Sequence, residues 1–497
     1  MGDEYMLDFL TKASQRKFKL VKLLSDSRTY VSINELTATL NCKERNILDD
    51  VKELSSPELL HIFEIETRSK SYKLHMKNNM TIDAVGHHIM NDNDCFSLLD
   101  YVFFNEGLSA EELAEKNHIS LPTLYRMISR INKGLKKRFH LKFETNPCRL
   151  EGDEVEVRSF YLQYFVEKYP ISEWPFDNLN EDEILNVFRK ITDSLNFTRQ
   201  YSFLRTIKIL LAVSHIRFKQ GFHISGRSTR MAKLQHRLSN SPLLYKQFSA
   251  VFKDVTNAEM FNDNLAYVVT DYFYFNYEEL LTHAHHDEYA ARSFINLSEM
   301  FNELSKTYDI PLVNKDALIY SVHNSAQMGF KNINIRYILV DNKSFLLKQF
   351  KNLFPDFYND IEKRIKTYLL LMELEYNSDL INHLIHNIFT RWENLLHHLY
   401  SRQRKIKIHV VSSHDIYHAR LMKSILKYEF HDEIKVSVLD SIDLNELLNI
   451  DSNIDIFVVN FTIPVADKRI IAVNDVPADE DFIEIKRLIA EIRINEN

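Results

Sequence analysis

A basic stretch without acidic residues lies between Glu115 and Glu144. It holds eight lysines or arginines. Such side chains neutralise phosphates, and the planar arginine fork also donates paired hydrogen bonds to base edges. On a helix over this stretch, the polar side chains expected to face outward are Thr123, Tyr125, Arg126, Ser129, Arg130, Lys133, Lys136 and Lys137. These residues predict contact with nucleic acid, although a solvated basic helix would have the same composition.

Two short helices joined by a tight turn would position these side chains. Ser109 and Glu112 form a capping-box pattern for the first helix, and Ser120 can cap the second, with Pro122 in its first turn. The positions expected to face inward are apolar or small: Leu113, Ala114, Ile119, Leu124, Ile128 and Ile131. The pattern is typical of a helix-turn-helix whose second helix enters the major groove of DNA.

The same pattern occurs 77 residues earlier in the chain. Its interior positions are Leu36, Thr37, Cys42, Ile47, Val51 and Leu54. This internal repeat predicts two helix-turn-helix units in tandem. The second helix of the earlier copy mixes Lys43 and Arg45 with four acidic residues, Glu44, Asp49, Asp50 and Glu53. We therefore expect the earlier copy to contact DNA weakly.

Each unit is followed by alternating segments that predict a β-hairpin, as in a winged helix. The first hairpin is expected to pair 60–65 with 71–74, and the second to pair 141–144 with 148–150. Arg68 and Lys70 at the first tip are candidate phosphate contacts. Ordinary exposed hairpin charges are the alternative for each.

A second repeat, with an offset of 108, lies in the helical middle of the chain. Segment 210–221 aligns with 318–329, and each copy has a histidine, His215 or His323, six residues before a glycine. Helices expected over 265–275 and 380–389 look like later counterparts. The later helix carries His383 and His386, whereas the earlier has Asp271 near the matching place. The repeat predicts two all-helical modules.

The last hundred residues predict a small α/β sheet with a parallel part. Strand-like runs at 405–411, 434–439, 454–460 and 469–473 alternate with helical segments at 417–428, 444–450 and 484–493. A ligand in such a sheet would lie at the carboxyl ends of the strands, here segment 412–415 with His414.

Composition limits the classes of function. The net charge of −7 requires any DNA contact to come from a local basic surface. Three distant cysteines fit a reducing cytoplasm, and no apolar run is long enough for a signal peptide or membrane span. His283, His285, His286 and Asp287 are more typical of a solvated turn than of a metal site. Since no nucleotide-binding or nucleophile motif occurs, we expect no catalytic residue, cofactor or metal, and no enzyme.

This order of domains resembles the Mga/AtxA family of Gram-positive transcription regulators. The resemblance implies that the helical modules are PTS regulation domains (PRDs), in which histidines accept phosphate from HPr or an EII component of the sugar phosphotransferase system. The matching positions are His215, His323 and His386. The last domain is similar to EIIB, but its loop at 410–414 lacks the cysteine that phosphotransfer needs. The resemblance also implies an activator that binds promoter DNA as a homodimer or higher homo-oligomer.

The expected fold is mainly α and multidomain. Its parts are two winged helix-turn-helix domains (1–80 and 81–165), two PRD-like modules (170–287 and 288–402) and an EIIB-like α/β domain (403–497). Two other functions remain open at this point. One is an RNA-binding PRD antiterminator, and the other is a phosphocarrier that uses His414 or the PRD histidines.

Overall fold

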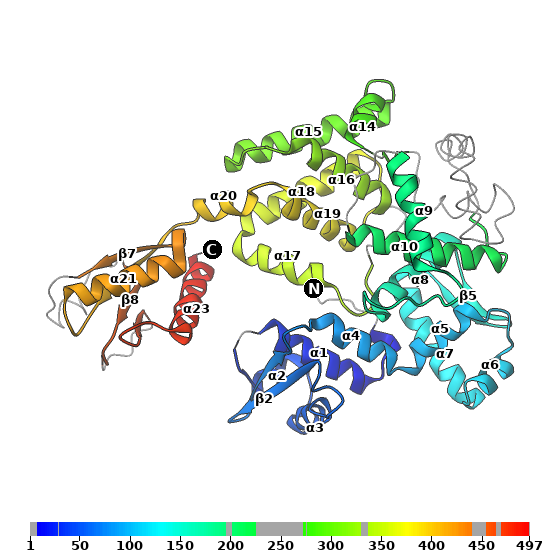
Figure 1. Cartoon of the computed structure of the whole chain (residues 1–497), viewed down its shortest axis with the longest axis horizontal. Coiled ribbons are helices and arrows are strands. Elements are labelled where there is room, and N and C mark those ends of the chain that lie inside the picture. Colours follow the sequence, from blue (N-terminus) through cyan, green and yellow to red (C-terminus); the bar gives the residue numbers. More distant parts are fainter. Residues whose placement is uncertain are drawn as a thin grey trace. The chain divides into compact units, whose positions relative to one another are not determined.

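The computed structural model describes residues 7–27, 29–194, 201–224, 272–274, 276–329, 336–439, 454–463 and 469–496. Asp271, the expected helix over 444–450 and most of that over 265–275 lie outside these residues. The chain divides into two compact units. The first comprises Met1–Glu299, Lys315–Lys348 and Ile361–Ile388, and the second comprises Met300–Asn314, Gln349–Asp360 and Phe389–Asn497. The fold is mainly helical (Figure 1).

The first part of unit one is a helical group with a small antiparallel sheet. Its elements are η1 (Leu7–Phe9), α1 (Lys12–Asp26), β1 (Val31–Ser32), α2 (Ile33–Leu40), α3 (Glu44–Leu54), β2 (Phe63–Arg68) and β3 (Ser71–Met76), with strand order β1-β3-β2. The predicted hairpin is present. Its first strand begins at Phe63, three residues later than expected, because Phe63 pairs with Met76. Leu20, Leu36 and Ile47 are fully buried in the shared core.

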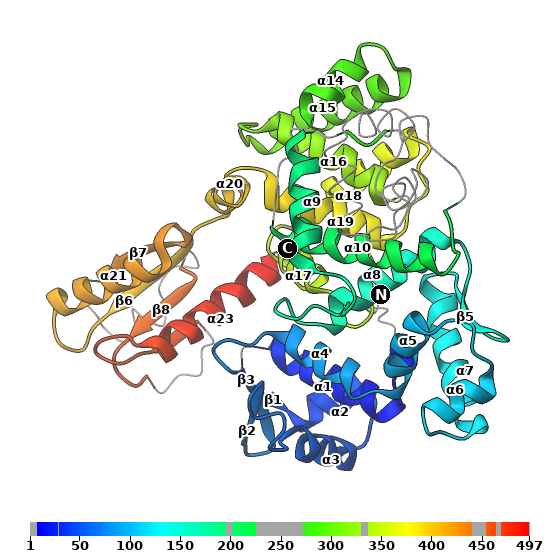
Figure 2. The same ribbon diagram turned by 45° about the vertical axis from the view of Figure 1, so that its right-hand side comes forward.

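The second part repeats this plan after a connecting helix. Its elements are α4 (Ile82–Asn91), α5 (Asp94–Phe104), α6 (Ala110–Lys116), α7 (Leu121–Arg138), β4 (Lys142–Thr145), β5 (Cys148–Glu151) and α8 (Glu154–Lys168). The predicted hairpin is confirmed as the antiparallel pair β4-β5. Both views show α5, α6 and α7 gathered beside β5 (Figures 1 and 2). An aromatic cluster around Phe103 and Phe165, whose rings lie 4.9 Å apart, joins α5 to α8.

Helices make up the middle of the chain. They are α9 (Glu181–Ser194), α10 (Tyr201–Lys219), α14 (Tyr277–Ala284), α15 (Glu288–Tyr308), α16 (Lys315–Gly329), α17 (Asn342–Leu353), α18 (Pro355–Leu371), α19 (Ser378–Arg391) and α20 (Leu395–Arg402). The two aligned histidines lie on α10 and α16. Both helices end near the glycine of the repeat, with Gly329 closing α16 and Gly221 at φ 90° just after α10.

The end of the second unit is a four-stranded parallel sheet. Its elements are β6 (Ile406–Val411), α21 (Ile416–Phe430), η2 (His431–Glu433), β7 (Ile434–Val438), β8 (Ile456–Val459), β9 (Ile470–Ala472) and α23 (Asp479–Glu496). The strand order is β7-β6-β8-β9, and all three pairings are parallel, as predicted for part of the sheet. Met422 of α21 and Ile485 of α23 belong to one core with Ile408 and Val458, so both helices cover the same face. Among the described residues, no helix has the length and apolarity to cross a membrane.

Candidate nucleic-acid interface and regulatory histidines

The predicted capping of α6 and α7 is confirmed atom by atom. Ser109 Oγ accepts a hydrogen bond from the Glu112 backbone N–H at 3.2 Å, and Glu112 Oε2 accepts one from the Ser109 N–H at 2.8 Å. Ser120 Oγ accepts from the Thr123 N–H at 3.3 Å. The predicted interior positions are buried, apart from Ile119, which is partly buried against the same core: Leu113, Ala114, Leu124, Ile128 and Ile131. Local sequence therefore fixes how α7 is presented.

The outward face of α7 carries most of the predicted contacts. The exposed members are Tyr125, Arg126, Ser129, Lys133, Lys136 and Lys137, whereas Thr123 and Arg130 are half-buried. Arg126 donates to Thr123 Oγ1 at 3.1 Å, which orients the guanidinium along the first turn. Lys133 Nζ lies 2.5 Å from Asp8 Oδ1, so this lysine is already paired within the chain. The strongest candidates for DNA contact are accordingly Arg126 and its neighbours in the first two turns.

Basic side chains of the first predicted winged helix-turn-helix domain (1–80) are paired with acids of the same domain. Lys70 Nζ lies 2.9 Å from Glu44 and Arg68 Nε lies 2.8 Å from Glu66. The pKa of Glu66 is lowered to about 2 by its hydrogen bond with Tyr30, then by those with His75 and Arg68. Arg45 is the most exposed at 91% of its side chain, although Asp49 lies 3.8 Å away. Lys43 is also exposed. This pairing leaves little unbalanced positive charge on the surface of domain 1–80.

Asp50, one of the four acidic residues counted in the second helix of the earlier copy, does not face solvent on α3. It is 2% exposed and accepts two hydrogen bonds from Arg16, at 2.5 and 2.9 Å. The pair joins α1 to α3. This pair could not be predicted, because its partners lie on different helices, 34 residues apart.

Arg138, the last residue of α7, also turns inward. Its guanidinium donates to the Tyr337 carbonyl at 3.0 Å and to Asp379 Oδ2 at 2.7 Å. Its side chain is only 11% exposed. One of the eight basic residues of the stretch is therefore a structural contact between α7 and α19, which sequence reasoning missed.

Further contacts join α8 to the segment around Tyr337. Glu167 accepts from the backbone N–H groups of Ile338 and Leu339 at 2.7 and 2.8 Å, and Arg336 lies 2.8 Å from Glu156. Helix α8 is thus tied to the segment that leads into α17.

A buried ionic cluster joins α10 to the helices around α6 and α8. Arg217 is 1% exposed and contacts Glu106, which precedes α6, and Glu154, which begins α8. Its Nη2 lies 2.7 Å from Glu154, and Arg158 Nε lies 2.9 Å from the same carboxylate. Burial raises the pKa of Glu106 to about 7, although Arg217 opposes the shift.

His215 and His323 are both buried, at 4% and 0% exposure. His323 Nε2 lies 2.7 Å from the Tyr272 carbonyl, and its Nδ1 lies 2.7 Å from Ser293 Oγ. A carbonyl can only accept, so Nε2 carries the proton and Nδ1 accepts from the Ser293 hydroxyl. The hydroxyl of Tyr368 lies 2.8 Å from Ser293 Oγ and extends the chain of hydrogen bonds. Modification of His323 would require these bonds to open.

His386 is half-buried on α19, one turn after His383. Lys343 Nζ donates to His383 Nδ1 at 2.9 Å, and burial lowers the pKa of Lys343 to about 8. Of the three predicted phosphate acceptors, His386 is the most accessible. His383 and Lys343 beside it were not among the predicted site residues.

Family models match two parts of the chain. The Mga helix-turn-helix domain matches residues 78–165, and the M protein trans-acting positive regulator (MGA) PRD domain matches residues 182–395. A trans-acting regulator of Streptococcus pneumoniae serotype 4 is 30% identical over 480 residues, covering 95% of this chain and 96% of its own. The chain belongs to the Mga/AtxA-like family of PRD-containing transcription regulators.

Two relatives from Bacillus anthracis extend the comparison. The anthrax toxin expression trans-acting positive regulator is 22% identical over 505 residues, or 97% of this chain and 99% of its own. The capsule synthesis positive regulator AcpB is 21% identical over 370 residues, or 73% and 64% of the two chains. The Mga helix-turn-helix match spans α6 and α7, so the family assignment and the capped basic helix fall on the same residues.

Proposed function

We propose that this Mga-like chain is a DNA-binding transcriptional activator in which α7 supplies the main grip on promoter DNA. The observation that carries the proposal is the contrast between the two units. The outward face of α7 has no acid of its own, although Lys133 is paired with Asp8, whereas Arg68 and Lys70 of the hairpin after α3 are each paired with a carboxylate. Activation is supported by the names of the two Bacillus anthracis relatives, which are positive regulators. Both units act as winged helix-turn-helix domains, with the first in a supporting role.

The DNA surface is tested by the double variant Arg126→Ala/Arg130→Ala. Each arginine that contacts a base contributes about 1–3 kcal/mol, so the double variant should bind promoter duplex at least about tenfold more weakly. The slope of log affinity against log salt should fall by about 0.9 for each lost phosphate contact. Fluorescence anisotropy over a salt series gives both quantities.

Arg45→Ala is the matched control, because Arg45 is the most exposed of the candidate arginines in the first unit. It should change affinity much less. If the α7 double variant keeps both the affinity and the salt slope of the wild type, the DNA surface lies elsewhere. Tighter binding to hairpin RNA than to duplex DNA would favour the antiterminator alternative.

We further propose that the PRD modules, 170–287 and 288–402, couple phosphorylation to DNA binding, with HPr or an EII component as phosphate donor. His386 is the foremost acceptor because it is half-buried, while His215 and His323 lie in the core. Incubation with labelled phospho-HPr, then mapping of the labelled histidine, tests this order. Rapid onward transfer to an EII acceptor would instead favour a phosphocarrier.

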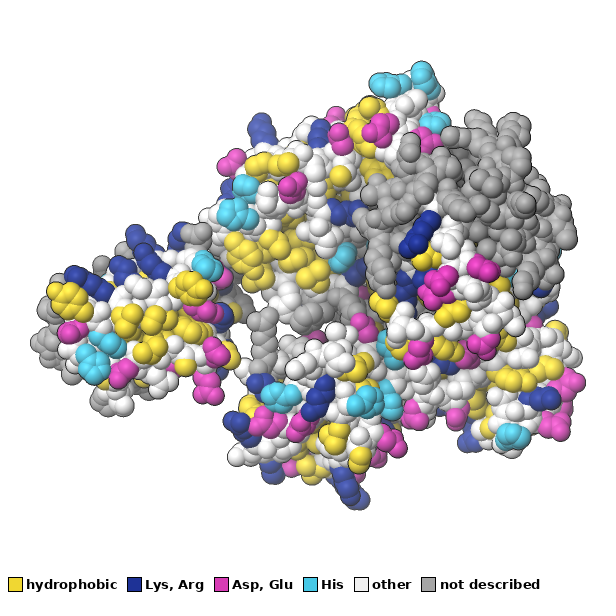
Figure 3. All heavy atoms as spheres, viewed as in Figure 1, with side chains coloured by type: hydrophobic (Ala, Val, Ile, Leu, Met, Phe, Trp, Pro, Cys, Tyr) yellow, Lys and Arg dark blue, Asp and Glu magenta, His cyan; other side chains and the backbone are white. Residues whose placement is uncertain are grey.

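Homo-oligomerisation is assigned to the EIIB-like domain, 403–497. Tyr417, Leu421 and Tyr428 of α21 are 72%, 50% and 81% exposed and recur at spacings of four and seven, on one helix face. Hydrophobic side chains gather over α21 in Figure 3. Light scattering of Tyr417→Lys/Leu421→Lys at micromolar concentration should show a smaller species than the wild type. An unchanged mass would assign assembly to another surface.

A further inference from the structure

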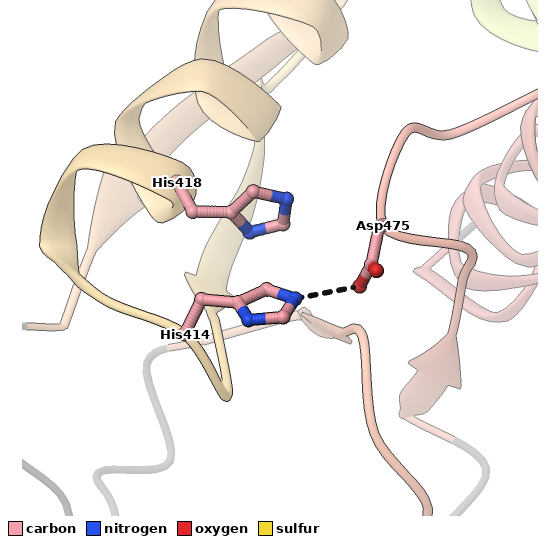
Figure 4. A group of neighbouring side chains, drawn as sticks. All are labelled: His414, His418 and Asp475. Atoms are coloured by element: carbon pink, nitrogen blue, oxygen red, sulfur yellow. Dashed lines mark ion pairs between the residues drawn. The ribbon is translucent and has the colours of Figure 1, made fainter.

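Three parallel strands of the C-terminal sheet end beside one another and bring together a small polar group. His414 lies in the loop after β6, His418 is in the first turn of α21, and Asp475 follows β9 (Figure 4). His414 Nε2 lies 3.2 Å from Asp475 Oδ1. One ligand atom from each of the three residues falls within 4.8 Å of the others. Neighbouring ligands on a tetrahedral zinc ion are separated by about 3.3 Å, so small side-chain rotations would bring all three onto one ion.

Contacts from the neighbouring residues hold two of these side chains in place. Ser412 Oγ lies 2.8 Å from His418 Nδ1 and also accepts from the His414 backbone N–H at 3.0 Å. Donation from Nδ1–H to this oxygen leaves the Nε2 lone pair of His418 available to a cation. Asn460, after β8, donates to Asp475 Oδ1 at 2.7 Å and accepts from the Ser413 N–H at 2.7 Å. Hydrogen bonds of this kind orient the ligands of protein metal sites.

The charges of the group also favour a cation. The two imidazole rings lie 4.8 Å apart, and they share a single carboxylate. Two neutral imidazoles and a carboxylate can all donate lone pairs to one divalent ion.

We propose that His414, His418 and Asp475 bind one divalent first-row transition-metal ion, such as Zn²⁺. Nitrogen and carboxylate ligands in this combination suit zinc and its neighbours better than Mg²⁺ or Ca²⁺, which prefer oxygen alone. Three protein ligands leave at least one position for water or an exogenous ligand. The ion links the loop that begins α21 to the loop after β9, so it would rigidify the carboxyl edge of the sheet.

The proposal is separate from DNA binding and is tested with Zn²⁺ alone on the full chain. Isothermal titration of metal-free protein should show one tight event per chain, with a dissociation constant of about 1 µM or lower. Asp475→Asn and His414→Gln should each weaken this event by about tenfold or more. Both side chains are more than half exposed, at 63% and 54%, so the variants should keep the wild-type melting temperature without metal.

His285→Asn/His286→Asn is the control, because these two histidines form an exposed pair in a turn elsewhere in the chain. It should leave the tight event unchanged. Co²⁺ gives a second readout, since the visible absorption of a bound ion should appear in the wild type and the control but not in Asp475→Asn. The proposal is overturned if no tight event occurs, or if Asp475→Asn and His414→Gln both retain it.

Discussion

Replacing Arg217 by Met should loosen the attachment of α10 to the helix-turn-helix unit. Arg217 is 1% exposed and contacts Glu106 and Glu154, which are 7% and 12% exposed. Removal of one partner from a buried ionic group costs about 3–5 kcal/mol, because the remaining charge stays desolvated. Met conserves much of the side-chain volume but loses the cation–π contact of the guanidinium, which lies 3.8 Å over the Phe222 ring. The loss is therefore electrostatic rather than a packing defect.

Hydrogen–deuterium exchange of the full chain measures this effect locally, without assuming two-state unfolding of a multidomain protein. A loss of about 3 kcal/mol corresponds to a decrease of roughly 150-fold in the protection of amides in α10. Amides just after the first turn of α8 should lose protection as well, since Glu154 begins that helix. Amides of the C-terminal sheet should be unchanged.

Two further variants make the result decisive. Arg45→Met changes an arginine that is 91% exposed and should leave protection unaltered. Arg217→Met/Glu106→Gln removes a carboxylate that would otherwise be left without its closest cation, and should recover part of the lost protection. If protection of α10 in Arg217→Met stays within about threefold of the wild type, less than 1 kcal/mol was lost and the cluster does not hold the helix.

Three other predictions concern Glu106 and two further buried groups, Arg138 and Ser293. Since the pKa of Glu106 is raised to about 7, its contribution to stability is full below about pH 4.5 and is lost as pH rises through 7. The melting temperature of Glu106→Gln relative to wild type should therefore rise between about pH 5 and pH 8. A constant difference between the two melting temperatures would contradict the raised pKa. Arg138→Gln should lower the free energy of unfolding by about 1.5–3 kcal/mol, because this arginine donates to Asp379. The slope of log DNA affinity against log salt should not change, since Arg138 does not contact phosphate. A reduced slope in the anisotropy series would place Arg138 on the DNA surface. Ser293→Ala should cost about 1–3 kcal/mol by removing the partner of His323 Nδ1 and of the Tyr368 hydroxyl. Hydrogen–deuterium exchange of α15 and α16 measures this loss locally, against Ser413→Ala at an exposed position; equal effects of the two variants would count against the buried chain of hydrogen bonds.

Short-range patterns explain what could be predicted from the sequence. The capping box of Ser109 and Glu112 lies within one helical turn, and the hairpin after α7 is marked by alternation over a few residues. The parallel sheet could be predicted because buried strands alternated with helices.

Long-range pairing explains what could not be predicted. Arg138 and Asp379 lie 241 residues apart, and each looks like an ordinary surface charge in the sequence. Asp50 was counted among the acids of α3, and only the packing of α1 on α3 shows that Arg16 covers it. Asp475 lies beside His414 because β9 pairs with β8 in the strand order β7-β6-β8-β9. No local sequence pattern specifies that order.

Arg138 offers a physical route from the phosphorylation that we propose on α19 to the DNA surface that we propose on α7. Asp379, His383 and His386 are spaced by four and three residues on α19, so they share one face of the helix. A phosphoryl group on His386 would add about two negative charges to this face, about two turns from Asp379, and would strengthen the negative field at the guanidinium of Arg138. Because Arg138 ends α7, a change in this contact would shift the end of the helix whose first turns we propose to face DNA. We infer that α19 acts on α7 through this single arginine, which predicts that Arg138→Gln abolishes any effect of phosphorylation on DNA affinity while Arg45→Gln preserves it.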